Sequence, residues 1–180
     1  MSKTRQTHSI DHLKEALIDL LLEKEYHKIT VGNITKKARV SRGTFYQHFL
    51  DKDDLAYTIG EETLQRFWNI LAQRNLDKRE KVIEALEHIQ LDFKHFKAIS
   101  QASHVHFSKK VQDLIKNIIN NNPALKKRIK EHTRVDNDII IQVFCASFET
   151  IISTWIKNSL KESPSEVADT IMKIEDIFWK

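Results

Sequence analysis

Apolar residues recur every three or four positions along most of the chain, which is the spacing of one face of an α-helix. With three glycines and two prolines, the chain also lacks the turn-forming residues that an all-β fold requires. We therefore expect an all-α protein. The predicted helices cover about 9–25, 31–38, 41–49, 53–74, 77–100, 104–120, a short segment ending near 132, 135–160 and 163 onward.

The stretch Thr30–Lys52 predicts two short helices joined by a tight turn. Its apolar positions form two faces: Val31, Ile34 and Ala38, then Val40, Phe45 and Phe49. The other side chains are mostly small, basic or hydrogen-bonding: Lys36, Lys37, Arg39, Ser41, Arg42, Thr44, Tyr46, Gln47, His48 and Lys52. A short helix with an apolar back and a front of this kind fits the major groove of DNA.

Polar residues mark the expected ends of the N-terminal helices. Residues 1–8 are polar and basic, and we expect a disordered arm before a helix that Ser9 caps. Asp53 is placed to cap the helix after Lys52. The turn between the two short helices usually needs a residue with positive φ, and Arg39 is not an obvious choice for it.

The net charge of the chain lies in its N-terminal part. Residues 1–52 hold 10 Lys and Arg against 6 Asp and Glu, a balance of +4, whereas the two signs cancel over residues 53–180. Lys and Arg supply most of the non-specific affinity for DNA because they neutralise phosphates. The uneven charge therefore favours DNA binding by the N-terminal part, although a balance of +4 also arises by chance.

The run ITVGNITKKARVSRGTFYQHFLDKDDL resembles the N-terminal DNA-binding domain of the TetR family of bacterial transcriptional regulators. Gly32 stands where a polar or basic residue is common in that family, and Arg39 stands where glycine is common. The resemblance implies a three-helix helix-turn-helix domain over 1–52, extending into the helix that starts at 53. A helical ligand-binding and dimerisation domain would then cover 53–180.

The resemblance also implies a role for individual residues. Arg42, Thr44 and Gln47 would face base edges, and Gly43 would let the helix approach the groove closely. Phosphate contacts would come from the side chains of Tyr46, His48 and Lys52 and from the backbone N–H groups of Thr30 and Ser41. Other interpretations stay open: Thr30 and Ser41 as plain helix caps, Tyr46 as a half-buried aromatic, and His48 as a solvated surface residue.

The C-terminal part predicts a dimer. Segment 135–160 is apolar over more than one helical face, so it must be buried on two sides, one of them against a second copy. The stretch FETIISTWIKNSLKESPSEVADTIMKI resembles the regulatory domain of a TetR-like subgroup from Firmicutes. The predicted dimer interface contains Phe148, Ile151, Ile152, Trp155, Ile171 and Ile174. In such a dimer, two DNA-binding domains would contact half-sites about one helical turn apart and so bind a palindromic operator in double-stranded DNA.

An effector site and a metal site are the other candidates. Family members commonly bind a small molecule between the helices of the second domain, and such a pocket would be lined by Phe93, Phe96, Phe107, Phe144 and Phe148, unless these are plain core. His88, Asp92 and His95 share one face of a predicted helix and could hold a metal, but a solvated helix face is the favoured interpretation. Cys145 lies in an apolar stretch and is expected to be a core residue.

We therefore expect a homodimeric regulator, a repressor controlled by an unknown small-molecule effector. The alternative is a TetR-like regulator, either a repressor or an activator, that responds to a protein partner instead of a ligand. No phosphate-binding loop or catalytic triad is visible, so neither an enzyme nor a cofactor is expected. No apolar run approaches the 18 or so residues that a membrane span needs, and the polar N-terminus has no signal-peptide core. We therefore expect a cytoplasmic protein with no membrane partner.

Overall fold

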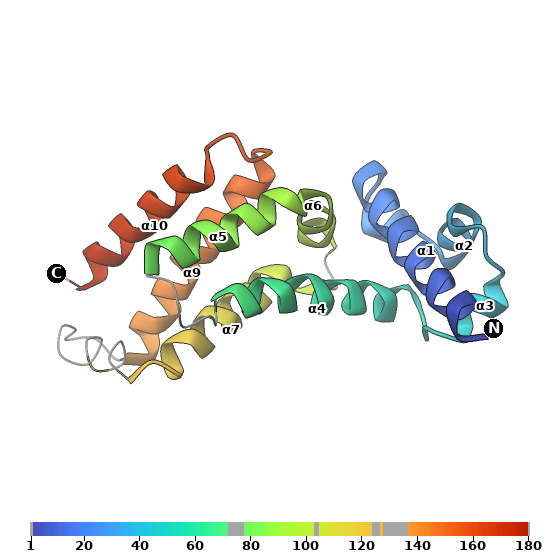
Figure 1. Cartoon of the computed structure of the whole chain (residues 1–180), viewed down its shortest axis with the longest axis horizontal. Coiled ribbons are helices and arrows are strands. Elements are labelled where there is room, and N and C mark those ends of the chain that lie inside the picture. The colour runs from blue at the N-terminus through green and yellow to red at the C-terminus, as the bar shows by residue number, and fades with distance from the viewer. Residues whose placement is uncertain (1, 72–77, 103–104, 124–126, 128–136, 180) are drawn as a thin grey trace. The chain divides into compact units, whose positions relative to one another are not determined.

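The computed structural model of the chain describes residues 2–71, 78–102, 105–123, 127 and 137–179 (Figure 1). No strand occurs among these residues, which confirms the expected all-α fold. The helices are α1 Ser2–Glu23, the 3₁₀ helix η1 Tyr26–Lys28, α2 Val31–Ala38, α3 Arg42–Tyr46, α4 Lys52–Leu71, α5 Lys78–Leu91, α6 Phe93–Gln101, α7 Phe107–Asn120, α9 Asn137–Lys157 and α10 Pro164–Trp179. The short helix expected to end near 132 lies outside the described residues.

Three expectations about helix ends are wrong. Helix α1 begins at Ser2 rather than near Ser9, because nothing in the polar N-terminal residues breaks a helix. The cap of α4 is Asp51, whose Oδ1 accepts the backbone N–H groups of Asp53 and Asp54 at 2.9 Å each. The single helix expected over 77–100 is two helices, α5 and α6, separated at Asp92.

The chain folds as two compact units. Unit 1 contains residues 1–63 and 94–107, and unit 2 contains residues 64–93 and 108–180. Helix α4 contributes to both units, and α6 belongs to the unit that holds the N-terminal helices. The functional division expected at residue 52 stays a prediction.

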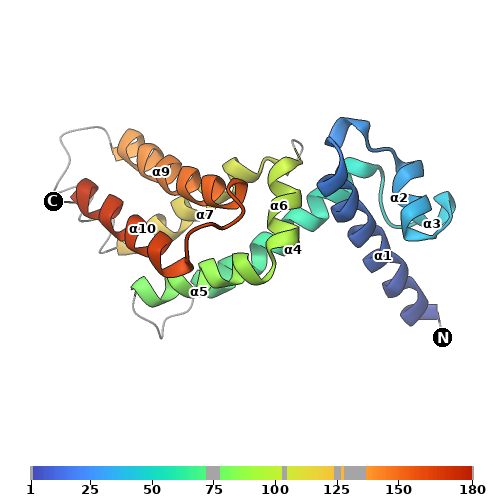
Figure 2. The ribbon, with the colours of Figure 1, turned by 90° about the horizontal axis from the view of Figure 1, so that it is seen from above.

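Unit 1 packs α2 and α3 beside α1 (Figure 2). Its core includes Leu13, Leu17, Ile34, Phe45 and Leu55, all fully buried. Ion pairs join its helices at the surface: Lys14 on α1 holds Glu62 on α4 at 2.6 Å, and Lys94 on α6 holds Glu15 and Asp19 on α1 at 2.7 and 2.8 Å.

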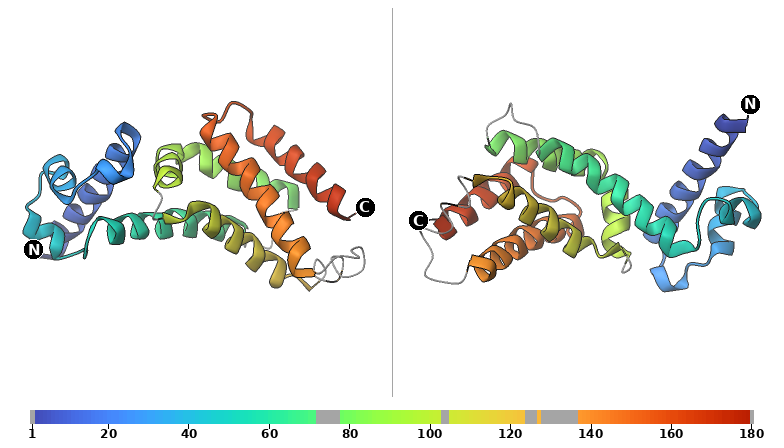
Figure 3. Two further views of the ribbon diagram at one scale, coloured as in Figure 1. Left: turned by 180° about the vertical axis from the view of Figure 1, so that it is seen from behind. Right: turned by 90° about the horizontal axis from the view of Figure 1, so that it is seen from below.

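Unit 2 places α10 along α5 and α9 (Figure 3). Phe144 and Cys145 on α9 pack with Ile119 and Ile141 in a buried cluster. The buried carboxylate of Glu175 on α10 pairs with Lys78 on α5. These contacts hold one side of α9 and α10 against their own chain.

One described helix contradicts the expectation about apolar runs. Over Asp138–Lys157, α9 is long and apolar enough to cross a membrane by length and composition alone. A core helix of a protein without any membrane segment passes the same test. One such helix on its own carries no membrane assignment, and 33% of its apolar window is buried within the protein, including Phe144, Cys145 and Ile152.

Candidate nucleic-acid interface

Both short helices begin at the caps that the sequence predicts. Thr30 Oγ1 accepts the backbone N–H of Asn33, and Asn33 Oδ1 accepts the N–H of Thr30, each at 3.1 Å, so α2 starts with a reciprocal capping box. Ser41 Oγ accepts the backbone N–H of Thr44 at 2.9 Å at the start of α3. The capping roles of Thr30 and Ser41 are confirmed, and their contact with phosphate stays a prediction.

The turn between α2 and α3 is closed by Arg39 in the left-handed region, at φ 56° and ψ 40°. The N–H of Arg39 reaches the carbonyl of Lys36 at 3.3 Å, and the N–H of Val40 reaches that of Thr35 at 3.1 Å. This pair of bonds is the Schellman motif, which usually has glycine at the left-handed position. An arginine there costs about 1–2 kcal/mol in backbone strain.

An apolar back holds the helix pair against unit 1. Ile34 and Ala38 on α2 are buried, and so are Phe45 and Phe49, whose rings lie 5.8 Å apart. Val40 in the turn is half-buried. The two apolar faces expected from the sequence therefore turn inward, which leaves the opposite side chains of α2 and α3 outside.

The exposed front of this helix pair is basic. Lys36, Arg39 and Arg42 are exposed, and none of the three forms an ion pair with another described residue. Lys37 differs, because its Nζ lies 2.5 Å from Glu23 Oε1 and 3.9 Å from Asp19 Oδ2. Among the described residues, the structure thus separates three cations without an ion pair from one that α1 neutralises.

Besides Arg42, four of the predicted contact residues lie on this front. Tyr46 is 53% exposed and meets Phe45 edge-on, so its hydroxyl end is accessible. Gln47 is exposed just after α3, and Thr44 is half-buried, with its Oγ1 2.9 Å from Ser41 Oγ. Gly43 is exposed, and an added Cβ would lie 3.6 Å from Ser41 Oγ, an ordinary contact. The fold itself therefore does not require glycine at this position.

Lys52 and His48 were expected to donate to phosphates, and these contacts stay predictions. The Nζ of Lys52 donates to the carbonyls of Tyr26 and Ile29, at 3.0 Å each, and lies 4.3 Å from the centre of the Tyr26 ring. Two of its three N–H donors are thus used to close η1 onto α4. Nε2 of His48 is buried and has no hydrogen-bond partner among the described residues.

A buried tyrosine completes the contact between η1 and α4. The hydroxyl of Tyr26 donates to the carboxylate of Asp53, which lies in the first turn of α4. Burial raises the pKa of Tyr26, and the hydrogen bond and negative charge of Asp53 raise it further. No sequence pattern indicates this role of Tyr26, because Tyr26 and Asp53 lie 27 positions apart.

The five phenylalanines predicted for an effector pocket do not fall in one unit. Phe96 and Phe107 are buried in unit 1, whereas Phe93, Phe144 and Phe148 belong to unit 2. The rings of Phe144 and Phe148 lie 4.4 Å apart on one turn of α9.

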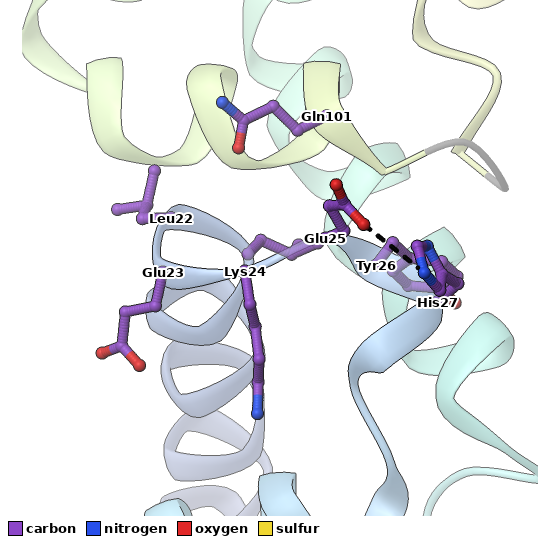
Figure 4. Close-up of a pocket in the computed structure, with 8 residues that line it drawn as sticks. Leu22, Glu23, Lys24, Glu25, Tyr26, His27 and Gln101 are labelled. Carbon is purple, nitrogen blue, oxygen red and sulfur yellow. Dashed lines mark ion pairs between the residues drawn. The ribbon is translucent and has the colours of Figure 1, made fainter.

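A depression of about 510 Å³ lies elsewhere, at the end of α1 (Figure 4). It is lined by Leu21, Leu22, Glu23, Lys24, Glu25, Tyr26, His27 and Gln101. Glu25 in its rim already pairs with His27 and Lys28, at 3.4 and 3.0 Å. None of the five predicted pocket residues is among its lining residues.

The predicted dimer interface is only partly accessible. Ile152, Trp155 and Ile171 are buried within the chain itself, while Phe148, Ile151 and Ile174 are half-buried. Between Ile139 and Thr154 the outer face of α9 carries no charged side chain, and the exposed Lys157 follows it in the last turn. This face carries Ile139, Val143, Ala146, Ser147, Thr150 and Thr154, all exposed or half-exposed, and we call it the α9 stripe.

The structure does not bring together His88, Asp92 and His95, the metal candidates that the sequence left as the less favoured interpretation. The described residues contain no group of three His, Cys, Asp or Glu side chains that could hold a metal ion. The helix break at Asp92 separates His88 from His95, and His95 Nε2 lies 3.3 Å from Glu15 Oε1 on α1. Cys145 is buried, and this burial raises its pKa to about 11, so it stays a protonated core thiol near neutral pH.

Two families of known proteins match the chain. The family described as bacterial regulatory proteins, tetR family, matches residues 14–57. The family described as transcriptional regulator C-terminal region matches residues 78–176, which include α6.

Individual relatives agree with these families. The fatty acid metabolism regulator protein of Bacillus subtilis (strain 168) is 20% identical over 179 residues, covering 89% of this chain and 90% of the relative. The dhaKLM operon transcriptional activator DhaS of Lactococcus lactis is 28% identical over 96 residues, 47% of this chain and 51% of the relative.

A solved structure shows the same fold. The TetR transcriptional regulator from Streptococcus agalactiae 2603V superposes with a TM-score of 0.71 at 20% identity, covering 95% of each chain. Its likeness extends over both parts of the chain that the two families match. This chain belongs to the TetR family of DNA-binding transcriptional regulators, which are not enzymes.

Proposed function

We propose that the chain is a cytoplasmic, homodimeric repressor that binds a palindromic operator and releases it when a small molecule binds. The observation that carries the DNA-binding part is the front of α2 and α3, where exposed cations and hydrogen-bonding groups stand over a buried apolar back. In this proposal Arg42, Thr44 and Gln47 read base edges, and Tyr46 holds phosphate.

The first experiment measures binding of the full chain to the DNA upstream of its own gene, by fluorescence anisotropy. Arg42→Ala removes an exposed cation with no partner among the described residues, so we expect roughly tenfold weaker binding or worse. Lys109→Ala, an exposed cation on α7 in unit 2, is the matched control and should bind like the parent. Equal binding by the parent and Arg42→Ala contradicts the proposed interface.

Dimer formation is proposed from the α9 stripe. Six uncharged side chains follow one another along the outer face of a 21-residue helix, with Ile139 and Val143 54% and 48% exposed. A second copy of the same face would remove this surface from water. A dimer would also supply the two DNA-binding domains that the two half-sites of a palindromic operator need.

The effector is proposed from the relatives. The Bacillus subtilis relative is named for fatty acid metabolism, which makes fatty acids and their derivatives the first compounds to test. A ligand of the proposed kind should raise the melting temperature of the chain and lower its affinity for DNA. If none of these compounds changes the melting temperature or the affinity for DNA, fatty acids and their derivatives are not effectors of this chain.

A second candidate is an activator that responds to a protein partner. The relative DhaS is named a transcriptional activator, so the experiment must distinguish activation from repression by this chain. Deleting the gene should raise transcription from the bound promoter if the chain represses, and lower it if the chain activates.

A further inference from the structure

The arginine in the turn between α2 and α3 is not explained by folding. Arg39 adopts φ 56°, a region that favours glycine. The two hydrogen bonds that close the turn use only backbone atoms, so glycine would form them equally well. The Arg39 side chain is exposed and forms no hydrogen bond or ion pair with another described residue.

The neighbours of Arg39 indicate what its side chain does. Lys36, in the last turn of α2, and Arg42, the first residue of α3, flank it by three positions on either side. Both are exposed and, within the described part of the chain, without an ion pair. Three exposed cations without an ion pair among the described residues therefore lie in succession: one at the end of α2, one in the turn and one at the start of α3.

We infer that Arg39 is an additional DNA-backbone contact, which binds a phosphate beside the helix proposed to enter the major groove. A guanidinium binds two phosphate oxygens at once, which a glycine cannot do. Residues with a strained backbone cluster at functional sites such as ligand clamps, so the left-handed Arg39 points to a binding role for its side chain. The inference rests on the proposed function and adds a residue to its interface.

The test compares Arg39→Gly with the parent chain in two measurements. Glycine relieves the strain, so the melting temperature should rise by about 2–4 °C. Binding to DNA should weaken at the same time, and the slope of log K against log salt should become shallower by roughly 0.9 for each phosphate that the variant no longer neutralises. The probes are a mixed-sequence duplex and the duplex from upstream of the gene, both of about 30 base pairs.

Because a phosphate contact carries no sequence information, both duplexes should lose affinity by a similar factor. Arg39→Lys keeps the charge and should keep most of the salt slope. Lys37→Ala is the matched control, because this neighbouring cation is already held by Glu23 and Asp19, and it should show the slope of the parent.

Two results overturn the inference: a parental salt slope in Arg39→Gly, or a melting temperature below that of the parent. Failure of the proposed function looks different. In that case the parent chain binds neither duplex even at low salt. This result overturns the inference together with the proposed function.

Discussion

Side chains of one type have different roles here according to their partners. Lys36 and Lys37 are adjacent in the sequence, yet only Lys37 is neutralised by α1. Lys52, whose contact with phosphate stays a prediction, closes η1 onto α4 with two of its three donors. Tyr26 lies at the centre of that contact, because its ring faces Lys52 and its hydroxyl binds Asp53.

Tyr26 makes the chain lose stability as the pH rises into the alkaline range. The folded chain keeps the Tyr26 proton because the pKa of this group is raised above its ordinary value near 10, whereas the unfolded chain loses the proton there. The free energy of unfolding should therefore be fully retained below about pH 10 and fall as the pH rises further. Urea unfolding between about pH 8 and 11 measures this.

Tyr26→Phe should remove this part of the pH dependence and lower the stability near neutral pH by about 1–2 kcal/mol, because Asp53 loses its donor. Tyr46→Phe alters an exposed tyrosine and should keep the parental pH profile. A profile for Tyr26→Phe as steep as that of the parent would show that another group is responsible.

Helix contacts within unit 1 depend on small residues as well as charges. Gly60 lies on α4, and a Cβ added to it would meet Val105 Cγ1 at 2.6 Å, closer than real contacts allow. Val105 is fully buried and its branched side chain has little freedom to move. Glycine at position 60 thus lets α4 approach the segment between α6 and α7.

Gly60→Ala should destabilise the chain by about 1–3 kcal/mol, because overpacking outweighs the gain of up to about 1 kcal/mol in helix propensity. Thermal unfolding measures the change. Adding Val105→Ala should cost less in the Gly60→Ala background than in the parent, since it makes room for the new methyl group. Gly43→Ala is the control: its Cβ has space, so the chain should lose no stability.

If the α9 stripe is the dimer interface, a charge introduced there should prevent two copies from associating. Val143→Asp puts a carboxylate on this uncharged surface. If two copies meet there, the variant should be a monomer of about 21.2 kDa by light scattering, and its affinity for operator DNA should fall sharply. Gln90→Asp adds the same charge on the exposed face of α5 and should leave the assembly unchanged. A dimer of parental strength in Val143→Asp would place the interface elsewhere.

Much of the fold and of the candidate interface could be predicted from the sequence, because their causes are local. The caps at Thr30 and Ser41 act over three residues, and the apolar faces of α2 and α3 repeat within one or two helical turns. The helix break at Asp92 was missed because neither glycine nor proline marks it.

The sequence by itself determined that the chain is helical, where most of its helices lie, and which family it resembles. Only the tertiary structure decided which cations lack an ion pair among the described residues. The same structure decided that Lys52 is bound by the carbonyls of Tyr26 and Ile29, and that α6 packs with α1 through Lys94. It also decided that Ile152 and Trp155 face their own core rather than outward. The physical reason is distance along the chain, since contacts between residues far apart in sequence leave no periodic pattern from which to infer them.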